Sequence, residues 1–237
     1  MANNENNNVV LVGNLASDLE FSHKTMNESF YRATLITRRL DPEKYDIIPI
    51  TVPGRLIDVN TIGEGTRVKI IGQFRSFNKF DEERNKKVLS LSVFAQDIIN
   101  ISALEIQEDL TQEYIDVLEE CKKDKDIIDI CGYICKDPVY RKTPKGREIT
   151  DLIVACHRFN KSDYLPCIAW GRNAKYYSNA QKGTKLQISG RIQSRTYNRF
   201  IEEGKFEPVM VFEVSIFSAD EVDLPTVAAD DVDNNEE

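Results

Sequence analysis

The sequence of 237 residues lacks the segments that would tie it to a membrane or an export route. It has no run of eighteen apolar residues, so we expect no membrane span and no membrane partner. The first eight residues, MANNENNN, are polar and contain no apolar signal segment. We therefore expect a cytoplasmic protein.

Catalytic and metal-binding motifs are also missing. The only histidines, His23 and His157, fall at unrelated places, and the turn at 63–65 is not a phosphate loop. The cysteines show no zinc spacing, and their odd number fits a reducing compartment. We expect no enzyme, no cofactor, no metal site, and buried, inert thiols at Cys121, Cys131, Cys135, Cys156 and Cys167.

The net charge of −8 is distributed unevenly along the chain. Residues 219–237 carry −8 and residues 104–126 carry −6, whereas residues 1–103 are neutral and residues 127–218 carry +6. The acidity is thus confined to two short segments, and 127–218 is a basic module suited to an anionic partner.

The stretch 182–200, KGTKLQISGRIQSRTYNRF, alternates like a strand with two different faces. Leu186, Ile188 and Ile192 fall on one face, and three arginines and Tyr197 fall on the other. Guanidiniums suit phosphates and an aromatic ring suits a nucleobase, so this face suits single-stranded nucleic acid. An ordinary solvated sheet face is the alternative.

The same pattern occurs twice. Residues 64–79, EGTRVKIIGQFRSFNK, match 182–197 through two Gly-Thr steps, two glycines and two serines at an offset of 118. The repeat extends to 9–21 with 128–140 and to 47–55 with 164–172, at offsets of 117 to 119. The sequence therefore predicts a duplicated domain of about a hundred residues.

Each copy predicts an all-β fold with one short helix. In copy one we expect strands at 9–15, 29–38, 46–52, 67–77 and 88–94, a helix over 55–62 and a charged loop at 81–87. In copy two we expect strands at 127–135, 148–156, 163–170, 184–196 and 208–217 and a helix over 173–180. This order is that of the five-stranded OB barrel.

The two acidic segments complete the predicted domain plan. Apolar residues at helical spacing predict a linker helix, packed by one face on a domain, whereas the composition of the tail predicts disorder. We expect OB fold 1 over 1–103, the acidic linker over 104–126, OB fold 2 over 127–218 and the acidic tail over 219–237.

Both copies resemble the bacterial single-stranded-DNA-binding protein family. The resemblance is carried by the opening 8–15, Asp18-Leu19-Glu20, Asp137-Pro138, Lys182-Gly183-Thr184 and the run from Gly190-Arg191-Ile192 to Arg195-Thr196-Tyr197. It implies OB folds that bind single-stranded DNA without sequence preference and assemble to four OB folds. A chain with two copies would then be a homodimer. The family's acidic tail ends in an apolar tip, which this chain lacks.

The resemblance also implies which residues contact DNA. Tyr164, Trp170 and Tyr197 stand at stacking positions of the family, and Phe159 lies within one residue of a fourth. Copy one has no aromatic at these positions, and the neighbouring Phe77 and Phe80 are its candidates for stacking on bases. For Tyr164 and Trp170, core packing of one of them is the alternative. The expected phosphate-binding residues are Arg191, Arg195, Arg199, Arg158, Arg172, Lys185, Arg75, Lys79 and Arg67.

Two functions follow as hypotheses. The first is binding and protection of single-stranded DNA in replication, recombination or repair, mainly through OB fold 2, in the nucleoid. The second is a primosome- or recombination-associated OB-fold protein whose OB fold 1 contacts proteins. Replication or recombination proteins are further expected partners in both cases.

Overall fold

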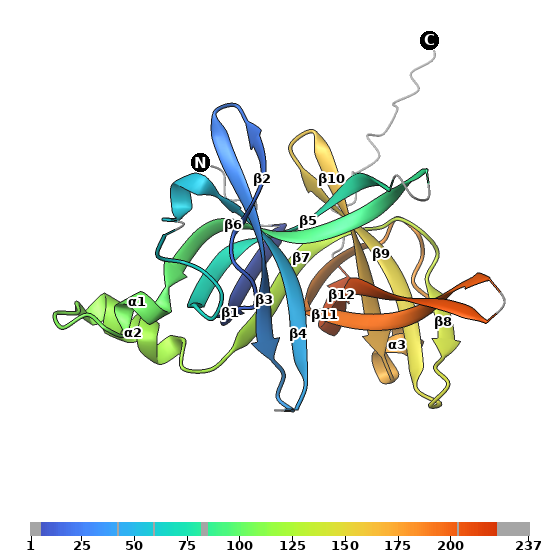
Figure 1. Cartoon of the computed structure of the whole chain (residues 1–237). Helices are drawn as coiled ribbons and strands as arrows, with labels where there is room; N and C mark the ends of the chain where they lie inside the picture. The colour runs from blue at the N-terminus through green and yellow to red at the C-terminus, as the bar shows by residue number, and fades with distance from the viewer. Residues whose placement is uncertain (1–5, 42, 59, 82–84, 203, 222–237) are drawn as a thin grey trace, which may run out of the picture.

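A computed structural model describes residues 6–41, 43–58, 60–81, 85–202 and 204–221. Two sets of six strands follow one another along the chain and lie side by side (Figure 1). The first set is β1 (Asn7–Leu15), β2 (Glu20–Thr25), β3 (Glu28–Arg38), β4 (Tyr45–Pro53), β5 (Arg67–Asp81) and β6 (Lys86–Asn100). The second set is β7 (Lys125–Ile134), β8 (Val139–Lys142), β9 (Glu148–Arg158), β10 (Lys161–Trp170), β11 (Lys185–Glu202) and β12 (Lys205–Glu221).

The strand pairings of the two halves are the same. In the first half β1 pairs with β3 and β5, β3 with β4, and β5 with β6, all antiparallel, whereas β4 pairs with β6 in parallel. In the second half β7, β9, β10, β11 and β12 repeat each of these pairings. Five strands of each half therefore close on themselves, and the short strands β2 and β8 each pair with one neighbour.

A direct strand pairing joins the halves. β1 and β7 run antiparallel from Asn7 opposite Ile130 to Val12 opposite Lys125, so all twelve strands form one connected sheet. Val9 lies opposite Ile128, its own counterpart in the repeat. The ladder is therefore centred on an approximate twofold axis that exchanges the two halves.

The residues that the strand alternation assigns to the core are buried. Leu186, Ile188 and Ile192 are fully buried, as are Val68, Ile70 and Phe74 at the matching positions of the first half. Strands present alternate side chains to opposite faces, so one face of each of these strands packs into the core. Burial of these apolar surfaces is the main favourable contribution to the stability of both halves.

Glycines that recur in both halves occupy crowded positions. A Cβ at Gly72 would lie 2.3 Å from the carbonyl oxygen of Phe94, and one at Gly190 would lie 2.5 Å from that of Ser215. Both glycines sit at irregularities of the β5–β6 and β11–β12 ladders. Only a residue without a side chain lets the two backbones approach so closely.

The expected helix over 55–62 is wrong. The structure has a short 3-10 helix, η1 (Gly54–Leu56), followed by a turn in which Asp58 Oδ1 accepts hydrogen bonds from the backbone and side chain of Asn60. Such local bonds compete with helix formation. In the second half the helix is α3 (Arg172–Tyr177), shorter than the expected 173–180.

The strands β2 and β8 were not predicted. The β2–β3 hairpin turns at Met26 and Asn27, both with positive φ, which is a less usual turn sequence than Asn-Gly. The residues of β8 are all exposed, so β8 lacks the apolar alternation by which strands are recognised.

The segment between the halves is partly helical, with α1 (Ile101–Leu104) and α2 (Gln112–Glu120) projecting from the first half (Figure 1). Leu110, Val117 and Leu118 pack against a small core that includes Val12 and Cys121. One side of α2 therefore packs on the first half. The part of the chain that the structure describes contains no helix long and apolar enough to cross a membrane. Residues 222–237 of the expected tail and 82–84 of the expected charged loop lie outside the described residues.

Candidate nucleic-acid interface

Each half has a groove beside the proline that recurs in the repeat. The first groove has a volume of about 360 Å³ and surrounds Pro49, with Arg32 on β3 and Phe77 and Lys79 on β5. The second has a volume of about 680 Å³ and surrounds Pro166, with Arg195, Tyr197 and Arg199 on β11. Aromatic and cationic side chains thus occur together in both grooves.

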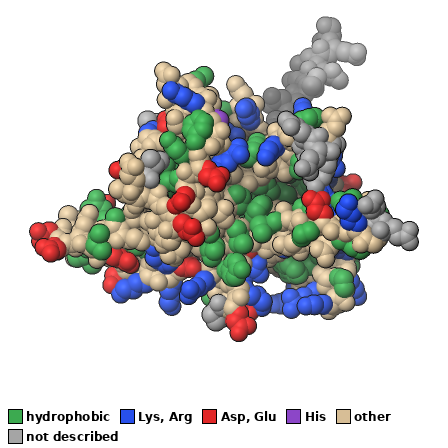
Figure 2. All heavy atoms as spheres, in the orientation of Figure 1, with side chains coloured by type: hydrophobic (Ala, Val, Ile, Leu, Met, Phe, Trp, Pro, Cys, Tyr) green, Lys and Arg blue, Asp and Glu red, His purple; other side chains and the backbone are tan. Residues whose placement is uncertain are grey.

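The two grooves adjoin. The β5–β6 hairpin reaches the second half, where Val88 and Leu89 line the second groove, and Ser90 and Leu91 line both grooves. Figure 2 shows apolar side chains in the hollow between the two halves, with Lys and Arg side chains along its upper rim. A surface that carries both aromatic rings and cationic side chains can bind several successive nucleotides of a single strand.

Tyr164 and Trp170 lie on the face of β10 that carries Pro166. Tyr164 is 49% exposed and Trp170 is half-buried, so neither ring is wholly inside the core. Phe159 is 97% exposed at the β9–β10 turn, where its φ is +47°. These three aromatics do not line the second groove together with Tyr197.

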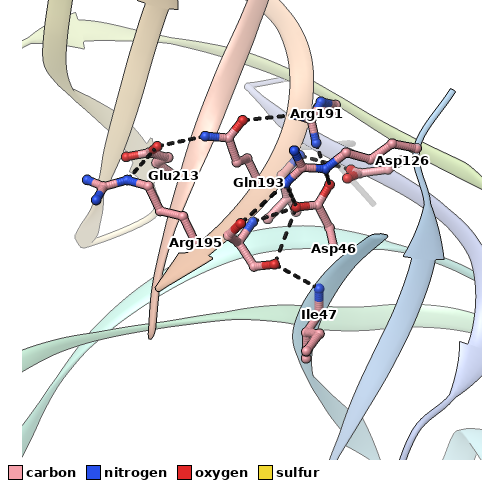
Figure 3. A network of polar contacts seen from close by, with 10 residues as sticks. Asp46, Ile47, Asp126, Arg191, Gln193, Arg195 and Glu213 are labelled. Atoms are coloured by element: carbon pink, nitrogen blue, oxygen red, sulfur yellow. Dashed lines mark hydrogen bonds and ion pairs between the residues drawn. The ribbon is translucent and has the colours of Figure 1, made fainter. Parts of the chain in front are cut away.

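Arg191 lies at the junction of the halves, where it contacts a buried acid. Its guanidinium donates to Asp46 of β4, which is 1% exposed (Figure 3). Asp46 also accepts hydrogen bonds from Arg39 at 2.6 and 2.8 Å and from the backbone N–H of Ser194 at 2.7 Å. Ser194 Oγ in turn accepts from the backbone N–H of Ile47 at 2.9 Å. Arg191 therefore holds the halves together, and the sequence pattern that placed it on an open face missed this contact.

Part of this network occurs again with the halves exchanged. The buried Asp163 of β10 accepts from the backbone N–H of Ser76 at 2.8 Å and from Arg158 at 3.0 Å. Ser76 Oγ accepts from the backbone N–H of Tyr164 at 2.8 Å. Asp46 and Asp163 are 117 residues apart, within the spread of the repeat offsets. That offset is the sequence signal that could have identified both acids.

Two further expected phosphate-binding residues have contacts within the chain. The guanidinium of Arg75 lies 3.7 Å from the ring centre of Phe94, and burial together with Arg158 lowers the pKa of Arg75 to about 10. Arg67 donates to the carbonyl of Cys121 at 2.9 and 3.2 Å and to Asp124 at 2.8 Å. Arg67 therefore fastens the end of the linker to the first half.

The remaining candidates lie on the surface in different places. Arg195 pairs with Glu213 and Arg199 with Glu207 across the β11–β12 ladder. Arg172 is exposed on α3, and the ammonium of Lys185 lies 5.9 Å from the ring centre of Tyr133. Phe80 is exposed near the end of β5.

The thiols belong to the interior. Cys121, Cys156 and Cys167 are buried, Cys131 and Cys135 are half-buried, and all five are free. Burial raises the pKa of Cys156 to about 12, so this thiol stays protonated and unreactive at neutral pH.

Replacing Arg67 by alanine is expected to leave affinity for an oligo(dT) strand within about twofold, because its guanidinium is engaged by the linker. Hydrogen exchange of α2 is expected to accelerate. Lys79→Ala is the matched control, since Lys79 is exposed in the first groove: it should weaken binding and leave α2 unchanged. A larger loss of affinity in Arg67→Ala than in Lys79→Ala would show that Arg67 contacts DNA.

Comparisons with known proteins agree on one family. Residues 127–217 match the Single-strand binding protein family. A Single-stranded DNA-binding protein from Clostridium tetani is 36% identical over 76 residues, which cover 29% of this chain and 52% of that protein. The Single-stranded DNA-binding protein 3 of Clostridium acetobutylicum is 32% identical over 98 residues, which cover 35% of this chain and 68% of that protein.

A comparison of folds covers both halves of the chain. The crystal structure of the wild-type single-stranded DNA binding protein from Thermus aquaticus has a TM-score of 0.65 to this chain at 17% identity, covering 92% of this chain and 93% of that one. The match to the first curated relatives spans about half of their length. On the shared sequence and fold, the chain belongs to the single-strand binding protein family.

Proposed function

We propose that the chain binds single-stranded DNA without sequence preference, through phosphate neutralisation and base stacking. The observation that carries this proposal is the pair of adjoining grooves, each with an aromatic ring and basic side chains, that share Ser90 and Leu91. The names of the relatives support the same ligand. Replication, recombination or repair is the proposed setting, in the cytoplasm and on the nucleoid.

The proposed architecture is two tandem OB barrels, over 1–103 and 127–218, joined by the acidic linker 104–126 and followed by the acidic tail 219–237. The closed pairing of five strands in each half supports this division. A homodimer would bring four barrels together. We propose that the second barrel contributes most to binding, because its sequence carries +6 whereas the first is neutral.

The proposal gives a limit on the salt dependence of binding. Four of the nine expected phosphate-binding residues form hydrogen bonds within the chain and line neither groove: Arg191, Arg158, Arg75 and Arg67. Five remain, of which Arg195 and Arg199 pair with Glu213 and Glu207 but line the second groove. Each phosphate contact on a single strand lowers log K by about 0.7 per unit of log salt. The expected slope is therefore no steeper than about −3.5.

Fluorescence of Trp170, the only tryptophan, tests the function. Titration with oligo(dT) at two salt concentrations should quench it, and less so at high salt, because the half-buried indole shares a strand face with the exposed Tyr164. Anisotropy of a labelled oligonucleotide follows binding independently. A double-stranded oligonucleotide is the control. Absence of binding in both measurements would remove the proposal.

A second candidate function is docking of a replication or recombination protein on the first half. Large apolar side chains that are exposed there and in the adjoining linker favour it. Phe21 is 63% exposed and Met26 98%, and Ile106 of the linker is 82% exposed. A stable complex that survives loss of DNA binding would support this function, whereas loss of the complex together with DNA binding would count against it.

A further inference from the structure

Two equivalent positions at the junction carry different side chains. Asn7 lies opposite Ile130 in the β1–β7 ladder, and Asp126 lies opposite Leu11. Asn7 and Asp126 are 119 residues apart, as are Leu11 and Ile130, so the approximate twofold axis exchanges the two pairs. The two halves thus place an amide and a carboxyl group in the same surroundings.

The amide of Asn7 makes two bonds to one residue of the neighbouring strand. Its Nδ2 donates to the carbonyl of Phe74 at 2.7 Å, and its Oδ1 accepts from the N–H of Phe74 at 3.0 Å. Both groups are buried. The side chain therefore clamps β5 beside β1, with one donor and one acceptor.

Asp126 makes only half of that clamp. Its Oδ1 accepts from the N–H of Ile192 at 2.9 Å, and Ile192 is the counterpart of Phe74. Its Oδ2 is buried and has no hydrogen-bond partner among the described residues. A carboxylate has no hydrogen to donate to the carbonyl of Ile192, whereas a carboxylic acid has one.

The charges around Asp126 are of both signs. Asp46 of β4 opposes its ionisation, whereas Arg191 of β11 favours it (Figure 3). Arg39, which precedes β4, favours it too. On its own strand, Lys125 is paired with Glu120, and the partner strand β1 presents Leu11. Burial, opposed by the N–H of Ile192, raises the pKa of Asp126 to about 7. Burial of a carboxyl group disfavours its charged form.

We propose that Asp126 is a buried proton-binding site, whose protonated form donates to the Ile192 carbonyl and completes the clamp that Asn7 makes in the first half. Deprotonation leaves a carboxylate oxygen facing a carbonyl oxygen, next to the carboxylate of Asp46. The junction between β7 and β11 is therefore tighter at acidic than at alkaline pH. This inference does not depend on the binding of DNA.

The direction of the pH effect follows from the two states. An aspartate in an unfolded chain has a pKa near 3.9, and that of folded Asp126 is about 7. Between these values the folded chain holds a proton that the unfolded chain releases, so the stability from Asp126 falls as the pH rises through this interval. Above about pH 7 Asp126 is ionised in both states, so it causes no further change in stability with pH.

Thermal unfolding of the full chain at about pH 5 and about pH 8 tests the proposal. The Tm of the wild type should fall with pH by about 5 °C more than that of Asp126→Asn, whose amide can donate at either pH. Asn7→Asp is the matched exchange and should make the fall steeper, because it places a second carboxyl group in the same surroundings. Equal pH dependence of the wild type and Asp126→Asn would overturn the proposal.

A direct titration does not rely on any variant. The carboxyl ¹³C signal of Asp126 in the wild-type protein, assigned by its absence in Asp126→Asn, should move with a midpoint near pH 7. A midpoint below about pH 5 would show that the group is ionised under ordinary conditions and would overturn the proposal.

Discussion

Replacing Tyr164 and Tyr197 together by alanine is expected to weaken binding of oligo(dT) by at least about 30-fold. Stacking of a base on an aromatic ring contributes about 1–3 kcal/mol, so two rings account for at least about 2 kcal/mol. The rings are 49% and 41% exposed, so their removal should not disturb the core. Anisotropy of a labelled strand gives the affinity, and thermal unfolding checks that the fold is intact.

Phe77→Ala with Phe80→Ala is the matched control in the first half, because these rings are similarly exposed, at 40% and 52%. Phe77 lines the first groove beside Lys79, whereas Tyr197 lines the second beside two arginines. We expect a loss of no more than about fivefold for this control pair. Equal losses would show that both halves contribute equally, and a larger loss for the phenylalanines would reverse the proposed ranking.

The repeat and the strand alternation were sufficient to predict much of the fold. Alternation identified Leu186, Ile188 and Ile192 as core residues, and they are fully buried. Matching glycines helped to reveal the repeat, and the structure places Gly72 and Gly190 where two backbones come close. These features depend on neighbours along one strand, and a sequence records such neighbours directly.

The candidate site was harder to predict, because alternation gives the face of a residue and not what packs on it. Arg191 has the pattern of an open face, yet Asp46, 145 positions earlier, packs there. Arg67 is similar, since the linker returns to it through Cys121. A long-range contact between two halves requires the sheet to be assembled first. Two arginines on the same strand face therefore differ in role: Arg195 lines the second groove, whereas Arg191, four residues earlier, lies at the junction.

The equivalence of buried polar residues across the repeat can be read from the sequence. Asp46 matches Asp163, and Asn7 matches Asp126, at offsets within the spread of the other matches. Polar residues that recur at the ends of apolar strands are candidates for a junction between copies, because unpaired buried polar groups are costly and must find partners.

Replacing Asp46 by alanine is expected to lower the free energy of unfolding by about 3–5 kcal/mol, because removal of one partner from a buried ion pair leaves uncompensated charge. Arg39 and Arg191 would lose their carboxylate, and the N–H of Ser194 would lose its acceptor. Urea unfolding measures the change. Because Asp46 belongs to the first half and Ser194 to the second, hydrogen exchange should accelerate in β4 and in β11 together.

Asp41→Ala is the matched control for Asp46→Ala. Asp41 also pairs with a cation, Lys44, but both side chains are exposed, and exposed ion pairs add little to stability. We therefore expect no measurable change in the urea midpoint. If Asp46→Ala behaved like Asp41→Ala, the β1–β7 ladder and the contacts of Ser76 with the second half would hold the junction, and the arginine and serine contacts to Asp46 would add nothing measurable. A loss confined to β4 would show that Asp46 supports its own half and does not join the two.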